Sequence, residues 1–73
     1  MIRDNLSTRI YLLRKEAGVS QDELGKAIGL TQIAISDIER GKRLTSVETL
    51  AAFAEYFKTT TDYLLGRSDI REP

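Results

Sequence analysis

The chain has 73 residues and a mass of 8.2 kDa, with 11 basic and 11 acidic side chains and a formal net charge of zero. This length fits one domain, because single domains typically run from about 50 to 200 residues. Cysteine and histidine are absent, which excludes disulfides and thiol chemistry and removes the commonest acid/base group and metal ligand. We therefore expect no enzyme, no metal site, no cofactor and no small-molecule ligand.

Hydrophobic residues are spread along the chain and make up 41% of it. No run of them approaches the roughly 20 residues that a bilayer-spanning helix needs. The first five residues lead into charged sequence and not into an apolar secretory segment. We expect a soluble, cytoplasmic protein that has no membrane partner.

The neutral total charge conceals an uneven distribution. Proteins that bind DNA usually carry a basic patch, so the total by itself argues against a nucleic-acid partner. The basic residues nevertheless gather in two places, one around Gly41 and one in the N-terminal quarter of the chain. The two clusters are Arg40, Lys42 and Arg43, and Arg9, Arg14 and Lys15. The sequence therefore predicts local positive surface on a neutral chain.

Apolar residues at helical spacing predict a first helix between Leu6 and Ala17. They recur at i, i+4, i+7 and i+11, so they form one stripe along the helix. Gly18 then ends it. The stripe consists of Leu6, Ile10, Leu13 and Ala17.

Ser20 and Glu23 predict the start of a second, short helix. At this spacing each side chain can satisfy the other residue's free backbone N–H, which is the pattern of a capping box. Leu24 and Ile28 supply the buried face, and the helix stops at Gly29.

A third short helix is predicted between Thr31 and Gly41. Thr31 is suited to cap its N-terminus. Ile35 and Ile38 lie together on one face of this helix, and Gly41 can take the positive φ that often ends a helix.

Two further helices complete the predicted domain. Ser46 begins the fourth. Its expected buried stripe is Val47, Leu50, Ala54 and Phe57. The threonines at 59–61 cap a last turn, which holds Tyr63, Leu64 and Leu65 before Gly66. We expect the polar tail, residues 67–73, to fray.

Residues 20–41 hold the most informative pattern, two short helices joined by only a few residues. Gly25 inside a helix costs about 1 kcal/mol relative to alanine, which indicates that another helix packs too closely for a side chain. Gly29 gives a sharp reversal, and Leu30 is expected to turn inward between the helices. Helix-turn-helix pairs of this kind cross at about 90 to 120°.

These residues resemble the Cro and C1 type, or Xre, family of helix-turn-helix transcriptional regulators over roughly residues 6–66. The resemblance implies an all-α fold, a compact five-helix bundle of the lambda-repressor-like type formed by residues 1–66, with 67–73 as a polar tail. It also implies a repressor that docks the third helix in the major groove of double-stranded DNA, as a homodimer on a two-fold operator. The parts that carry it are Leu13-Arg14, Ser20-Gln21, Leu24, Gly29-Leu30-Thr31, Ile35, Ile38-Glu39-Arg40-Gly41, Leu50-Ala51 and Asp62-Tyr63-Leu64-Leu65-Gly66.

Four residues on the outward face of the third helix are candidates for reading bases. Gln32 can pair with adenine N6 and N7, Ile33 can contact a thymine methyl, and Asp37 can accept from cytosine N4. The resemblance places Gln32, Ile33 and Asp37 at base-reading positions, and Ser36 shares their face. The alternatives are that Ile33 belongs to the core and that Asp37 is solvated or paired within the protein.

Phosphate contacts are expected from Gln21 and from the basic residues after the third helix. Gln21 stands in the first turn of the second helix, where free N–H groups and the helix dipole favour a phosphate. The resemblance implies that Gln21 also braces Gln32. Arg40, Lys42 and Arg43 lie where backbone phosphates would pass, and such contacts fix register without reading sequence. The alternatives are an ordinary surface glutamine and a solvated loop.

The resemblance also makes Arg14 and Glu39 a structural ion pair between the first and third helices.

A competing function is also open, in which the same fold serves as a protein-interaction or antitoxin-type module. Asp37 and the acidic stretch 20–39 favour this alternative. Salt separates the two functions. DNA binding releases counterions at each neutralised phosphate and therefore weakens steeply as the salt concentration rises, whereas an apolar protein interface does not.

Overall fold

A computed structural model of the chain describes residues 2–73. These residues form five helices and no strand, in agreement with the all-helical fold that the sequence predicts. None of these described helices has the length and apolar character needed to cross a membrane. In chain order they are α1 (Ile2–Ala17), α2 (Gln21–Ile28), α3 (Gln32–Glu39), α4 (Val47–Phe57) and α5 (Thr61–Leu64).

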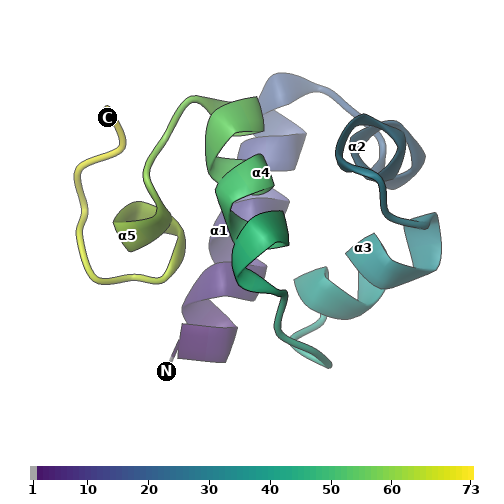
Figure 1. Ribbon diagram of the computed structural model, residues 1–73, viewed down its shortest axis with the longest axis horizontal. Helices are drawn as coiled ribbons and strands as arrows, with labels where there is room; N and C mark the ends of the chain where they lie inside the picture. The colour runs from purple at the N-terminus through teal and green to yellow at the C-terminus, as the bar shows by residue number, and fades with distance from the viewer. Residues whose placement is uncertain (1) are drawn as a thin grey trace.

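Helix α1 runs through the middle of the molecule, with α4 in front of it in the view of Figure 1. The pair α2 and α3 lies on one side, and α5 with the C-terminal end of the chain lies on the other. Helix α1 contacts α3 and α5, while α4 contacts α2 and α5. The central helices therefore hold the α2–α3 unit at one edge of the bundle.

One hydrophobic core draws side chains from all five helices. The stripe predicted on α1 is buried through Leu13, although Ala17 at its end is exposed. Phe53 is fully buried, although it was not part of the buried stripe predicted for α4. Val47, which that stripe included, is 78% exposed. Val47 is the first residue of α4, and the buried residues of this helix, Phe53 and Ala54, lie further along it. The fully buried large side chains are Leu6, Ile10, Leu24, Ile35, Ile38, Phe53 and Leu64.

Side-chain caps set the start of the helices after α1. Ser20 and Glu23 form the predicted capping box, with Glu23 N donating to Ser20 Oγ at 3.0 Å and Ser20 N donating to Glu23 Oε1 at 3.2 Å. Thr31 and Ser46 cap α3 and α4 as expected. Within the predicted threonine run, Thr60 is the residue that caps α5. These caps satisfy backbone donors that would otherwise lack partners.

Gly25 is required by the turn between α2 and α3. A Cβ at this position would lie 2.5 Å from the carbonyl oxygen of Leu30. Leu30 N donates to the Gly25 carbonyl at 2.8 Å, which holds the returning chain against the helix. The prediction of a close approach is confirmed, but the neighbour is the backbone of the turn and not a second helix.

The tail after α5 lies along α1, where the sequence predicted fraying. The buried hydroxyl of Thr59 donates to the Arg71 carbonyl at 2.6 Å. Arg9 Nη1 on α1 donates to the Ser68 carbonyl at 2.8 Å. Partners supplied by α1 and by Thr59, between α4 and α5, thus give this polar segment a defined path.

Candidate nucleic-acid interface

Helix α3 has a buried face and an outer face, which we define as Gln32, Ile33, Ser36 and Asp37. Ala34, Ile35 and Ile38 are buried in the core. Ile33 is 74% exposed, so its placement in the core, one of the two alternatives, is wrong. Gln32 is exposed, and Ser36 and Asp37 are half-buried. The four candidate base-reading residues therefore share one accessible surface.

Asp37 contributes a negative charge to the outer face of α3. Within residues 2–73, no Lys or Arg nitrogen lies within 4.0 Å of its carboxylate. The alternative of an ion pair inside the protein is therefore absent from the described part of the chain. A carboxylate at such a position can accept hydrogen bonds from a partner and also repels phosphate.

Arg14 and Glu39 are paired across α1 and α3. Arg14 Nε donates to Glu39 Oε2 at 2.6 Å, and Arg14 Nη2 donates to Glu39 Oε1 at 3.0 Å. Their side chains are only 10% and 4% exposed. Arg14 Nη1 also donates to the Val19 carbonyl at 2.9 Å. The hydrogen bond to Glu39 raises the pKa of Arg14 although burial acts in the opposite direction.

Two glutamines continue from this ion pair to the protein surface. Gln21 Nε2 donates to Glu39 Oε1 at 3.1 Å. Gln32 Nε2 donates to Gln21 Oε1 at 3.4 Å. The four side chains form a continuous chain, which we call the Arg14–Gln32 network. Sequence reasoning treated the ion pair and the two glutamines separately, because no spacing along the chain signals that Glu39 touches both Arg14 and Gln21.

The basic loop, defined as Arg40 to Arg43, leaves α3 with its charged side chains exposed. Gly41 has φ +73°, and its N–H donates to the Ile38 carbonyl at 3.1 Å. Lys42 N donates to the Asp37 carbonyl at 2.8 Å. These two bonds form a Schellman motif, which fixes the direction of the chain as it leaves the helix.

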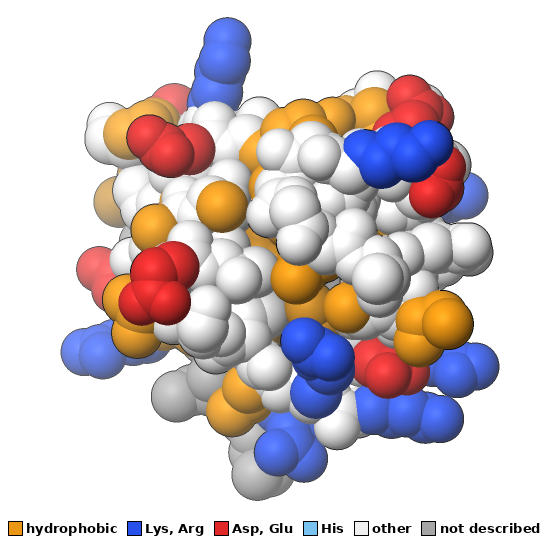
Figure 2. Space-filling view, turned by 45° about the vertical axis from the view of Figure 1, so that its right-hand side comes forward, with side chains coloured by type: hydrophobic (Ala, Val, Ile, Leu, Met, Phe, Trp, Pro, Cys, Tyr) orange, Lys and Arg blue, Asp and Glu red, His pale blue; other side chains and the backbone are white. Residues whose placement is uncertain are grey.

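The positive charge of this loop is not neutralised by the protein. Among residues 2–73, no ion pair joins Arg40, Lys42 or Arg43 to an acidic side chain. Figure 2 shows Lys and Arg side chains gathered in the lower part of this face, where Figure 1 places α3 and the loop that follows it. The predicted local basic surface is therefore present beside the outer face of α3.

The other basic cluster is largely used inside the fold. Arg9 Nη1 donates to the Tyr63 carbonyl at 2.8 Å, and its guanidinium carbon lies 4.2 Å from the centre of the Tyr63 ring. Arg9 Nη2 also pairs with Asp69 at 3.0 Å. Arg14 is buried in its pair with Glu39, which leaves Lys15 as the exposed member. Tertiary contacts therefore occupy two of the three charges of this cluster.

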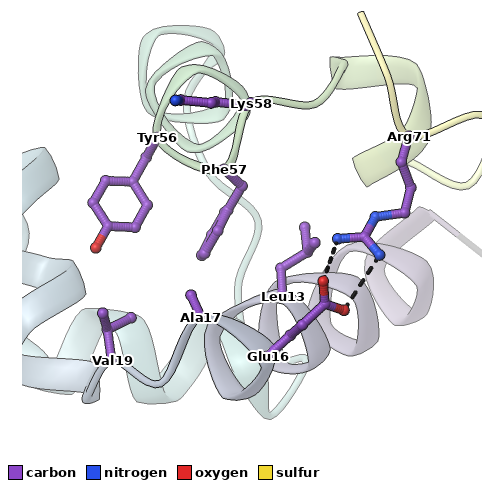
Figure 3. A pocket seen from close by; sticks show the side chains of 8 residues that line it. All are labelled: Leu13, Glu16, Ala17, Val19, Tyr56, Phe57, Lys58 and Arg71. Atoms are coloured by element: carbon purple, nitrogen blue, oxygen red, sulfur yellow. Dashed lines mark hydrogen bonds and ion pairs between the residues drawn. The ribbon is translucent and has the colours of Figure 1, made fainter.

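A hollow of about 340 Å³ lies between the C-terminal ends of α1 and α4, with Arg71 of the tail at its side. Leu13 and Phe57 line it, and Arg71 closes one side by pairing with Glu16 at 2.8 and 3.2 Å (Figure 3). Both the hydrogen bond and the charge of Arg71 lower the pKa of Glu16. No residue of α2 or α3 lines this hollow, so it is separate from the outer face of α3.

Two adjoining short helices, the second with an exposed polar face beside a basic loop, define the class of helix-turn-helix domains. A helix-turn-helix family model matches residues 10–64 of the chain. The HTH-type transcriptional regulator ImmR of Bacillus subtilis (strain 168) is 29% identical over 66 residues, which is 90% of this chain and 52% of ImmR. Repressor protein C2 of Salmonella phage P22 is 35% identical over 60 residues, covering 82% of this chain and 28% of the repressor.

Solved structures give the same assignment. The P22 c2 repressor in complex with a synthetic operator superposes with a TM-score of 0.82 at 33% identity, covering 86% of this chain and 96% of that one. The restriction-modification controller protein C.AhdI from Aeromonas hydrophila gives a TM-score of 0.77 at 26% identity, over 85% and 94% of the two chains. The chain belongs to the helix-turn-helix family of Cro/C1-type transcriptional regulators, which are DNA-binding regulators and not enzymes.

Proposed function

We propose that this domain is a sequence-specific repressor of transcription that inserts α3 into the major groove of double-stranded DNA. The observation that carries the proposal is the outer face of α3, where Gln32 and the 74% exposed Ile33 point away from the core. Beside them lies the basic loop, whose cations form no ion pair with any residue in the range 2–73. The major groove is about 12 Å wide and admits an α-helix. The P22 c2 repressor, solved with a synthetic operator, has a closely similar fold.

Each residue of the outer face has a base partner that suits its chemistry. Gln32 offers an N–H and a carbonyl oxygen to adenine, and Ile33 offers apolar contact to a thymine methyl. Asp37 can accept a hydrogen bond from cytosine N4, and the Ser36 hydroxyl can donate or accept. We assign the reading of sequence to these four side chains.

Residues at the edge of this face would hold the phosphate backbone. Gln21 is the first residue of α2, where backbone N–H groups and the helix dipole favour an anion. Arg40, Lys42 and Arg43 add three exposed positive charges at the other end of the unit. Such contacts fix the register of a recognition helix without reading bases.

We further propose that two copies bind a two-fold operator. One small module buries little DNA surface, and helix-turn-helix proteins commonly bind half-sites about 34 Å apart as dimers. Tyr56 and Ile70 near the C-terminal end are exposed and available for a dimer contact, whereas Leu64 is in the core. The spacing of half-sites in selected DNA would test this assembly.

The function is tested by selecting duplexes from a random pool and then measuring affinity against salt. Each neutralised phosphate contributes about −0.9 to the slope of log K against log salt, so three cations per copy give roughly −3. An enriched sequence with a slope of this size supports the proposal. Failure to enrich any sequence would contradict it, and salt-insensitive capture of a protein would indicate the interaction module.

A further inference from the structure

We infer that Glu39 is a positioning residue for sequence discrimination, because it sets which edge of the Gln32 amide faces the DNA. This inference rests on the proposed function. It assigns the buried ion pair a role beyond stability. The Arg14–Gln32 network leads outward from the buried Glu39 carboxylate to the exposed amide of Gln32.

The Glu39 carboxylate imposes one orientation on Gln21. The two hydrogen bonds from Arg14 reach both oxygens of the Glu39 carboxylate, which is only 4% exposed. A carboxylate can only accept hydrogen bonds. Gln21 must therefore turn its NH2 group toward Glu39, as the 3.1 Å contact shows. The opposite orientation would place the Gln21 carbonyl oxygen against a carboxylate oxygen, which is repulsive.

This orientation is passed on to Gln32. With its NH2 group on Glu39, Gln21 turns its carbonyl oxygen toward α3, where it accepts from Gln32 Nε2 at 3.4 Å. Gln32 thus has one N–H occupied. Its second N–H and its carbonyl oxygen stay free, and this donor and acceptor pair matches N7 and N6 of adenine.

The opposite amide orientation would favour a different base. If Gln21 turned its NH2 group toward α3, Gln32 would accept that hydrogen bond through its carbonyl oxygen. Two N–H donors would then face the groove, and these match the N7 and O6 acceptors of guanine. A buried carboxylate near the middle of the bundle therefore biases the surface toward adenine.

The test uses Glu39→Gln, which keeps the size of the side chain and an acceptor for Arg14 but adds a donor that can face Gln21. Duplexes are those that the unmodified protein selects from a random pool, and Gln32→Ala identifies the base pair that Gln32 reads. We expect Glu39→Gln to lower the preference for adenine over guanine at that pair about tenfold, within the range of one bidentate contact. Affinity for scrambled duplex should stay within about twofold.

Two further variants separate positioning from stability. Glu39→Asp keeps the charge opposite Arg14 and withdraws the carboxylate from Gln21, so it should also lower the preference. Thr59→Ala removes a buried hydrogen bond outside the network and should destabilise the fold without changing the preference. A comparable loss of preference in Thr59→Ala would overturn the inference.

A double-mutant cycle tests whether Glu39 acts through Gln21. In a Gln21→Met background the network is already broken, so adding Glu39→Gln should change the preference by less than about twofold. An unchanged preference in both Glu39→Gln and Glu39→Asp would refute the positioning role while leaving DNA binding intact. Failure of the unmodified protein to select any sequence would instead refute the proposed function.

Discussion

Two arginine–carboxylate pairs on α1 have similar geometry and very different surroundings. Arg14 meets Glu39 at 2.6 and 3.0 Å, with side chains 10% and 4% exposed. Arg71 meets Glu16 at 2.8 and 3.2 Å, with side chains 44% and 63% exposed. Water screens the second pair and not the first, so burial and not geometry decides how much each contributes.

The two pairs also support different regions. The buried pair joins α1 to the end of α3, next to the basic loop, whose cations form no ion pair within residues 2–73. The exposed pair holds the tail beside the hollow shown in Figure 3, and there the positive charges of Arg9 and Arg71 are both matched by acidic partners. Within residues 2–73, the basic loop thus keeps its three cations unpaired, whereas Arg9 and Arg71 are paired at the tail.

The largest effect expected is the loss of stability in Glu39→Ala. Removing one partner of a buried pair leaves an uncompensated charge and costs about 3 to 5 kcal/mol of unfolding free energy. Urea denaturation measures it. Glu16→Ala is the matched control and should change stability far less, because its pair is exposed. Equal losses in the two variants would contradict the role assigned to burial.

The second prediction concerns Gln32, the surface end of the Arg14–Gln32 network, and the sequence discrimination assigned to it. Gln32→Ala should cost about 1 to 3 kcal/mol on the preferred duplex and little on scrambled DNA, since it removes one bidentate base contact. Competition titrations with both duplexes measure the ratio. An unchanged specificity ratio would place the reading of sequence elsewhere on the surface.

The third prediction compares the loss of an unpaired arginine with the loss of a paired one, measured by DNA affinity and its dependence on salt. Arg43→Ala should weaken binding to all duplexes alike and reduce the salt slope by about one, because it removes one phosphate contact. Arg71→Ala, in which the lost arginine was already paired with Glu16, should leave the slope unchanged. A loss confined to one sequence in Arg43→Ala would show that this residue reads bases.

The smallest effect expected is the pH dependence of the exposed pair. Arg71 lowers the pKa of Glu16 in the folded protein, so the pair stabilises the fold above the ordinary glutamate pKa of about 4.3. This contribution is lost as the pH falls through the lowered value. Glu16→Gln should therefore be slightly less stable than the unmodified chain at pH 7, with the difference vanishing in acid. A difference that grows in acid would have the wrong sign.

The sequence by itself determined the local structure and the family. Capping residues such as Ser20, Thr31 and Ser46 mark helix starts through bonds that span three residues, so they are readable without knowledge of the fold. Gly41 marks a helix end for a similar reason, because its positive φ is a local property. The five helices and the outward placement of Gln32 and Ile33 follow from these signals and from helical spacing.

Only the tertiary structure decided which side chains are buried and which are paired with residues distant in the sequence. Helical spacing placed Val47 in the buried stripe of α4 and left Phe53 out, yet Val47 is 78% exposed and Phe53 is fully buried. The composition of the chain counts Arg9 as basic surface, but the tail supplies the partners that consume its charge. Glu39 joins Arg14 to Gln21 across intervals of 25 and 18 residues, and only the packing of α1, α2 and α3 brings those three side chains together.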